Sequence, residues 1–167
     1  MMNETQTVGF EYTVEVLDKD GNVTDREVVH NIMPLEGIHH VLNTVLKGGA
    51  QVAQWHIGLY ETAYTPTPND TMANFPSAAV EATEYAATTR MTFIPGNLAA
   101  GSVDNSANAV EFEFTAAKLI YGGFISSSSA KGSTSGVLLS AVRFGSPKSV
   151  DSSSTLRVTA GFTMASL

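Results

Sequence analysis

The chain has 167 residues, a net charge of −7 at pH 7 and no cysteine. The acidic balance and the scattering of the nine lysine and arginine residues argue against nucleic-acid binding, and the lack of cysteine excludes disulfides and thiolate-bound zinc. Only 15% of the residues are charged, below the roughly 25% of typical soluble domains, and this composition suits a protein that packs against neighbours.

The length predicts a single domain over residues 1–167, because it is sufficient for one hydrophobic core and too short for two. Within this domain we assign an N-terminal hairpin or arm to residues 1–33, a helix to 34–47 and sandwich strands to 52–167. Met1 to Thr7 carry one Glu and no basic residue, so we recognise no secretion signal. Since no apolar run approaches the ~18 residues of a membrane span, we expect no membrane partner.

The N-terminal segment predicts a β-hairpin. Apolar residues alternate from Val8 to Val16, a polar turn follows, and the chain can return antiparallel over Val23 to Val29. The alternative is a calcium loop, because Asp18, Asp20 and Asn22 occupy alternate positions. That alternative fails because the glycine is fourth rather than sixth and the twelfth position is not Glu.

The pattern then changes to the period of a helix. Leu35, Ile38, Leu42 and Val45 fall on one helical face, which Val41 and Leu46 widen. Pro34 suits the first helical position, and two glycines at 48 and 49 can end the helix. We expect its apolar stripe to be buried, either against the sheets or against a partner.

The central part of the chain combines a strand with an unusually long connection. Trp55 to Tyr60 alternates as a strand, Pro66 and Pro68 break the pattern, and an extended run resumes at Tyr85. Roughly two dozen residues separate the two runs, whereas tight hairpin connections take about 2 to 5. A connection of this length suggests that the loop itself has a function.

The second half of the chain predicts further strands over residues 91–94, 110–114, 119–125, 137–144 and 156–164. Gly122 and Gly123 suggest a bulge or a close approach of another backbone, Ser126 to Gly136 suggests a flexible surface loop, and Pro147 to Asp151 suggests a turn. About eight strands with one early helix predict an all-β fold, a two-sheet antiparallel sandwich resembling a jelly roll.

A search for catalytic or metal-binding patterns finds none that fits. The four histidines lack the spacing of a strand-borne metal site, and the run from Gly132 to Gly136 has Thr rather than Ser at its centre. Two carboxylate pairs occur, Glu111 with Glu113 and Glu81 with Glu84. The first pair is interpreted as charge on the solvent face of a strand, and general acid–base use is the alternative weighed for both pairs. We therefore expect no enzyme activity, no cofactor and no metal.

The long loop contains the candidate contact residues. Tyr64 and Phe75 are aromatic residues of the kind enriched at protein contacts, although packing in the core is the alternative for both. With Pro66 and Pro68 they form the predicted interface.

Several short segments together resemble small virion proteins of tailed bacteriophages, of the capsid decoration or cement type. These segments are the strand I-G-L-Y, the loop Y-T-P-T-P-N-D-T, a following E-Y and Arg, the strand L-I-Y-G-G-F-I, a Ser/Gly loop and a closing S-T-L-R-V-T. The resemblance extends from about Leu42 to the end of the chain. Many proteins of this type are jelly rolls.

The resemblance implies a structural protein that decorates and stabilises a capsid by binding between major capsid subunits. The implied partners are the major capsid protein and further copies of the chain, as a homodimer or homotrimer, without nucleic acid. The implied location is the capsid exterior of a virion, after synthesis in the bacterial host cytoplasm. The alternatives are a tail, collar or fibre component and a glycan-binding β-sandwich.

Overall fold

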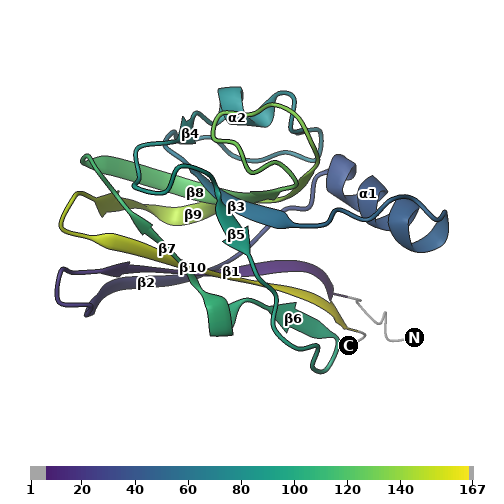
Figure 1. The fold of residues 1–167 in the computed structure, drawn as a ribbon, viewed down its shortest axis with the longest axis horizontal. Helices are drawn as coiled ribbons and strands as arrows, with labels where there is room; N and C mark the ends of the chain where they lie inside the picture. The colour runs from purple at the N-terminus through teal and green to yellow at the C-terminus, as the bar shows by residue number, and fades with distance from the viewer. Residues whose placement is uncertain (1–6, 166–167) are drawn as a thin grey trace.

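The structure is a computed structural model that describes residues 7–165. Two antiparallel five-stranded sheets pack face to face, and a helix extends from one end of the sandwich (Figure 1). The predicted all-β, two-sheet antiparallel architecture with one helix in the N-terminal half is confirmed.

The first sheet has the order β2-β1-β10-β6, and β7 also pairs with β10. Its strands are β1 (Thr7–Leu17), β2 (Val23–His30), β6 (Ser102–Asp104), β7 (Val110–Glu113) and β10 (Thr155–Ala165). The second sheet has the order β4-β3-β8-β9, and β5 also pairs with β3. Its strands are β3 (Trp55–Tyr60), β4 (Glu81–Ala82), β5 (Met91–Phe93), β8 (Lys118–Ser126) and β9 (Leu138–Val150).

The helices are α1 (Leu35–Leu46), the short α2 (Phe75–Ala78) and the 3₁₀ turn η1 (Ser106–Asn108). None of these described helices is long and apolar enough to cross a bilayer. The sandwich has ten strands rather than about eight. The two additional strands, β4 and β6, are two and three residues long, too short for an alternating pattern to predict them.

The N-terminal hairpin is part of the sandwich and not a separate arm. β1 lies in the middle of the first sheet, where it pairs with β2 on one side and with β10 on the other. The β1–β10 ladder runs from Thr7 opposite Ala165 to Leu17 opposite Thr155. The predicted division between residues 1–33 and the sandwich strands is therefore wrong, because the first strand completes its sheet only by pairing with the last.

The inner faces of the two sheets form the main core. Tyr12 and Val14 of β1, Val158 of β10 and Leu59 and Ile125 of the second sheet belong to one cluster and are fully buried. Fully burying a large apolar side chain contributes about 1.5–3 kcal/mol, so this cluster is the main source of stability.

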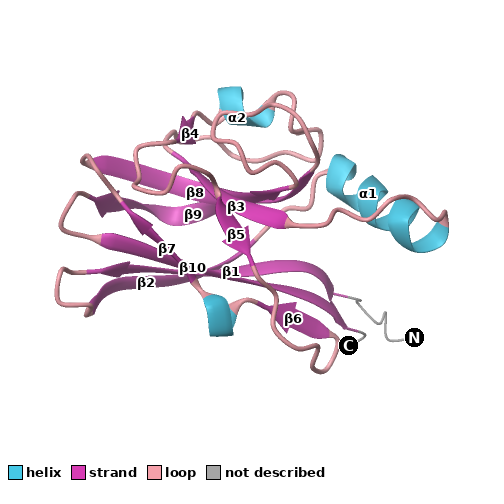
Figure 2. Ribbon diagram, in the orientation of Figure 1, coloured by secondary structure: helices cyan, strands magenta, loops and turns pink. Residues whose placement is uncertain are grey.

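The second sheet is covered on its outer face as well. The connection between β3 and β4, with α2, and the β8–β9 loop lie on the side of this sheet that faces away from the first (Figure 2). Met72 and Phe75 of the connection form a second buried cluster with Tyr60, Phe124 and Leu138 of the sheet. Burial of both faces explains why β3 and β8 are apolar at nearly every position rather than at alternate ones.

β9 continues through Pro147 instead of ending at residue 144 as predicted. Ile120 of β8 pairs with Lys148, whereas Gly122 pairs with Arg143, so the strand bulges between these two positions. Proline has no N–H to donate to a strand ladder, but a residue in a bulge does not need one. The strand can therefore continue beyond Pro147. Both alternatives predicted for the paired glycines occur, since the bulge lies directly beside Gly122 and an added Cβ at Gly122 would overlap the Val142 carbonyl oxygen.

The β1–β2 connection is the turn that the sequence predicts. The Asp18 carboxylate accepts hydrogen bonds from the backbone N–H groups of Asp20 and Asn22, each at 2.9 Å. The bonds from Asn22 hold the pKa of Asp18 below its usual value. Asp18 thus stabilises the turn directly.

Candidate interaction surface

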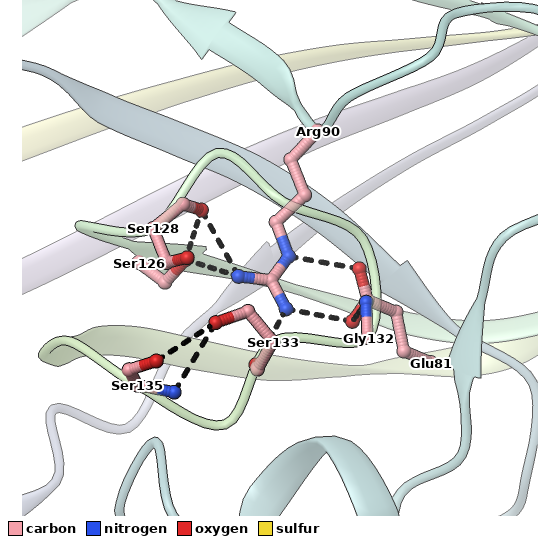
Figure 3. Close-up of polar contacts among 7 residues, drawn as sticks. All are labelled: Glu81, Arg90, Ser126, Ser128, Gly132, Ser133 and Ser135. Carbon is pink, nitrogen blue, oxygen red and sulfur yellow. Dashed lines mark hydrogen bonds and ion pairs between the residues drawn. The ribbon is translucent and has the colours of Figure 1, made fainter.

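A fully buried ion pair lies between the second sheet and the loops that cover it. The guanidinium of Arg90 binds the Glu81 carboxylate with two bonds, Nε to Oε1 at 2.8 Å and Nη2 to Oε2 at 2.7 Å (Figure 3). The remaining Arg90 donors reach Ser126 Oγ and the backbone carbonyls of Ser128 and Ser133 at 2.9–3.1 Å. We call these five residues the Arg90 cluster.

The Arg90 cluster has no donor left for a ligand. An arginine side chain carries five N–H groups, and five bonds leave Arg90 in this structure. The Glu81 carboxylate also accepts the Gly132 N–H at 2.8 Å. A group already saturated with partners can hold loops together but cannot bind an anion or move a proton, so we assign the cluster a structural role.

The Arg90 cluster also changes the interpretation of two sequence features. The loop from Ser126 to Gly136 is not a free surface loop, because two of its carbonyls and one of its N–H groups are bound by Arg90 and Glu81. Glu81 is buried rather than part of a surface pair with Glu84, which instead forms an ion pair with Lys118. The other carboxylate pair projects to solvent as expected, since Glu111 and Glu113 are exposed on β7.

Tyr64, one of the predicted interface residues, is held within its own loop. Its hydroxyl donates to Asp70 Oδ1 at 2.7 Å, and the Asp70 carboxylate also accepts the Thr67 N–H at 2.8 Å. The bond to this carboxylate raises the pKa of Tyr64 above its usual value. The Tyr64 ring is half-buried, and Pro66 and Pro68 lie beside it at half-buried and exposed positions.

Phe75 does not lie at the surface. Its side chain is fully buried and makes T-shaped contacts with Tyr60, Tyr64 and Phe124 at ring-centroid distances of 5.4–5.8 Å. The interface role predicted for Phe75 is therefore wrong in this conformation, because the ring is used to pack the loop onto the sheet. Of the four predicted contact residues, Tyr64, Pro66 and Pro68 retain exposed surface.

The helix α1 is attached to the sandwich through the polar and small residues of its first turn. Glu36 Oε2 accepts hydrogen bonds from the backbone N–H of Met72 at 2.8 Å and of Leu138 at 2.7 Å. Gly37 lies so close to β9 that an added Cβ would be 2.5 Å from the Leu139 carbonyl oxygen. The first turn therefore fixes which side of α1 contacts the sheet.

The apolar stripe of α1 points away from that contact. Successive helical residues are about 100° apart, so the stripe is centred roughly 100° from the side that carries Gly37 and Val41. Its side chains are exposed, to 72% for Val45 and 75% for Leu46. We name the stripe the α1 face, and it consists of Leu35, Ile38, Leu42, Val45 and Leu46. The expectation that the sheets bury this stripe is wrong, and a partner is the remaining alternative.

An apolar groove runs beside the α1 face. It has a volume of about 530 Å³ and lies between α1, Trp55 at the start of β3, and the loop that follows β5. Trp55 is held in place by a T-shaped contact with His40, 5.4 Å between ring centroids. Leu98 forms the opposite wall and is itself strongly exposed. The helix stripe and the groove together form one apolar surface.

No protein-family model matches the chain, and no curated protein matches its sequence.

A polar groove on the outer face of the first sheet is a second candidate. It has a volume of about 700 Å³, and its floor includes Gly9 of β1 and Gly161 of β10. Glu11, Asp104 and Thr159 are among the side chains around it. No group of three His, Asp or Glu residues within residues 7–165 is placed to hold a metal ion.

Sequence reasoning identified the α1 stripe but neither its exposure nor the groove. The signal for exposure was Gly37, because a glycine inside an amphipathic helix indicates close backbone packing on its own side rather than on the stripe. The groove had no such signal, since Leu98 lies in a loop without periodicity.

Proposed function

We propose that this protein is a structural virion protein, which decorates and stabilises the capsid of a tailed phage by binding between major capsid subunits. The observation that carries the proposal is the exposed apolar α1 face, because contiguous apolar surface on a folded chain marks a protein contact. The resemblance of the sequence to capsid decoration proteins supports the same function. The protein then acts by contact and not by catalysis.

Binding between subunits stabilises a shell in the same way that a ligand stabilises a folded protein. A partner that binds only the assembled state shifts the equilibrium toward that state in proportion to its affinity. Burial of apolar surface contributes roughly 25 cal/mol per Å², so a contact of this kind, repeated around a shell, adds a large total. We place the protein on the capsid exterior, with the major capsid protein and further copies of itself as partners.

The proposal is tested by quantitative mass spectrometry of purified particles of the phage that encodes the chain. A decoration protein is expected at a copy number comparable with that of the major capsid protein. Absence from the particles would refute the proposal, and a handful of copies would favour a tail, collar or fibre component instead.

A matched pair of variants connects this test to the α1 face. Leu42→Glu places a charge on the α1 face, whereas Leu119→Glu changes a leucine of equal exposure on β8, with exposed fractions of 48% and 47%. We expect the first variant to be depleted from particles and the second to be retained. Equal retention of both would mean that the α1 face is not the contact.

The polar groove of the first sheet favours a second candidate function, the binding of a glycan. Carboxylates and hydroxyls such as Glu11, Asp104 and Thr159 are suitable partners for sugar hydroxyls. A glycan array followed by thermal-shift measurements tests this function. A saccharide that stabilises the wild type but not Glu11→Gln would support it, and the absence of any hit would exclude it.

A further inference from the structure

We infer that the α1 face binds the α1 face of a second copy of the same chain, with the two helices antiparallel about a twofold axis. The inference rests on the proposed function in one respect, because it assigns the α1 face to the contact between copies of the chain, one of the two kinds of contact that the proposed function includes. Three properties of the described residues favour a second copy: spacing, charge and area.

The spacing of the α1 face is that of a helix–helix seam. Leu35, Ile38, Leu42 and Val45 follow one another at intervals of three, four and three residues, which is the a and d pattern of a coiled coil. Val41 and Leu46 flank this seam, and of these two Val41 packs against the core while Leu46 is exposed. The seam is about 15 Å long at 1.5 Å per residue, and a second α1 offers a seam of the same length and spacing.

An antiparallel arrangement gives the seam a definite register. Leu35 and Leu42 occupy positions a of the heptad, and Ile38 and Val45 occupy positions d. In an antiparallel pair of helices, a position a on one helix faces a position d on the other. A twofold axis near the middle of α1 therefore brings Leu42 opposite Ile38 of the other copy. Leu35 then lies opposite Val45 of the other copy. All four layers of the contact are apolar.

The charge around the α1 face suits contact between identical surfaces. Between Leu35 and Tyr60 the only charged residues are Glu36 and Lys47, and residues 94–103 contain none. The Glu36 carboxylate is occupied by two backbone N–H groups. A charged side chain close to a twofold axis meets its own copy, so the low charge of this surface favours contact between identical faces.

The exposed apolar area is sufficient for a dimer. A biological interface buries a total of at least about 1,000 Å², counted over both partners. If about 65% of this area is apolar, each partner must contribute roughly 300 Å² of apolar surface. The five side chains of the α1 face and Leu98 are 36–82% exposed. At roughly 60–120 Å² for each complete aliphatic side chain, they supply a few hundred Å².

The test is the mass of the full-length protein in solution, measured by analytical ultracentrifugation at micromolar concentration. The wild type is expected at twice the 17.6 kDa of one chain, and Leu42→Glu and Ile38→Lys are each expected at the mass of one chain. Leu119→Glu is the control and should remain dimeric. Circular dichroism and thermal unfolding establish that each variant is folded.

Mixing the two variants tests the register. In a mixed dimer, the carboxylate of Leu42→Glu faces the ammonium of Ile38→Lys in one layer, while the equivalent layer on the other side of the axis stays apolar. We expect an equimolar mixture to recover the dimer mass. A mixture that stays monomeric would refute the antiparallel register, and a monomeric or trimeric wild type would refute the twofold contact.

The outcome is separable from that of the proposed function. A monomeric protein found in many copies per particle would overturn the dimer and leave the virion function in place. A dimer that is absent from particles would overturn the virion function and leave the α1 contact in place.

Discussion

The Arg90 cluster and the α1 face reverse the usual distribution of polar and apolar residues in opposite ways. Arg90, the largest of the fully buried side chains, carries a charge, whereas five aliphatic side chains of one helix are exposed to solvent. The difference between the two regions is whether partners are present within the chain. Arg90 has all of its partners, and the α1 face has none among the described residues 7–165.

The comparison shows that hydropathy alone does not decide where a side chain lies. Burial of Arg90 is tolerated because a carboxylate, a hydroxyl and two carbonyls replace its water. Exposure of the α1 stripe follows from the side of the helix on which Gly37 and Glu36 attach it. The polar groups of the Arg90 cluster are satisfied within one chain, whereas the α1 face is suited to contact with another molecule.

Removing Arg90 should have the largest effect. Arg90→Met leaves the buried Glu81 carboxylate without its counter-ion, and breaking a buried ion pair from one side costs about 3–5 kcal/mol. Urea denaturation measures this loss of unfolding free energy.

Two variants control this prediction. Arg90→Met combined with Glu81→Leu removes both charges and should recover much of the loss. Arg157→Met removes a partly exposed ion pair with Glu15 and should cost about 1 kcal/mol or less. A loss for Arg90→Met no larger than that for Arg157→Met would contradict the structural role of the cluster.

Displacing α1 should have the next largest effect. The side chain introduced by Gly37→Val would overlap the Leu139 backbone, and overpacking of this kind costs about 1–3 kcal/mol. The same urea measurement applies, with Asn43→Val as the control for valine at an exposed position of the same helix. Equal losses in the two variants would mean that Gly37 is not the point of attachment.

His56 provides a smaller, pH-dependent effect beside the Arg90 cluster. Burial, and secondarily the charge of Arg90, lower the pKa of His56, and its Nδ1 has no hydrogen-bond partner. In the unfolded chain His56 is protonated near pH 6.5, whereas in the folded chain its protonation requires a lower pH. Acidification from about pH 7.5 to 5.5 should therefore lower the free energy of unfolding.

The measurement compares urea unfolding of the wild type and His56→Gln at both pH values. The variant lacks the titrating group and should lose less stability on acidification. An identical pH dependence in the two proteins would show that His56 does not contribute.

Changing the α1 face should have the smallest effect on the stability of the single chain. Leu46→Gln replaces a side chain that contacts mainly solvent, so the free energy of unfolding should change by less than about 0.5 kcal/mol at low protein concentration. The appropriate measurement is thermal or urea unfolding over a range of protein concentrations. A large loss at the lowest concentration would mean that Leu46 packs within its own chain.

Regular elements were predictable from the sequence wherever one face of a strand is buried. The alternation of β1 and β10 gave their inner faces correctly at Tyr12, Val14 and Val158, because a half-buried strand imposes a period of two. Phe162 follows the same pattern but is only partly buried, and it lines the apolar groove beside α1.

The contacts between elements were not predictable in the same way. Glu81 and Arg90 lie nine residues apart on either side of irregular chain, and their partners come from a loop more than thirty residues further on. No periodicity relates these positions. The choice between the sheets and a partner for the α1 stripe stayed open for a similar reason, since a helical pattern identifies an apolar face without indicating what covers it.

The pairing of β1 with β10 has a consequence for how the protein is made. β1 leaves the ribosome well before β10, the strand that it borders for its whole length, because all the other described strands lie between the two in the sequence. Until then one edge of β1 and its apolar face lack their native neighbours, and an unpaired edge invites association with other chains. Completion of the first sheet must therefore wait for nearly the whole chain, and such distant pairing makes folding slow.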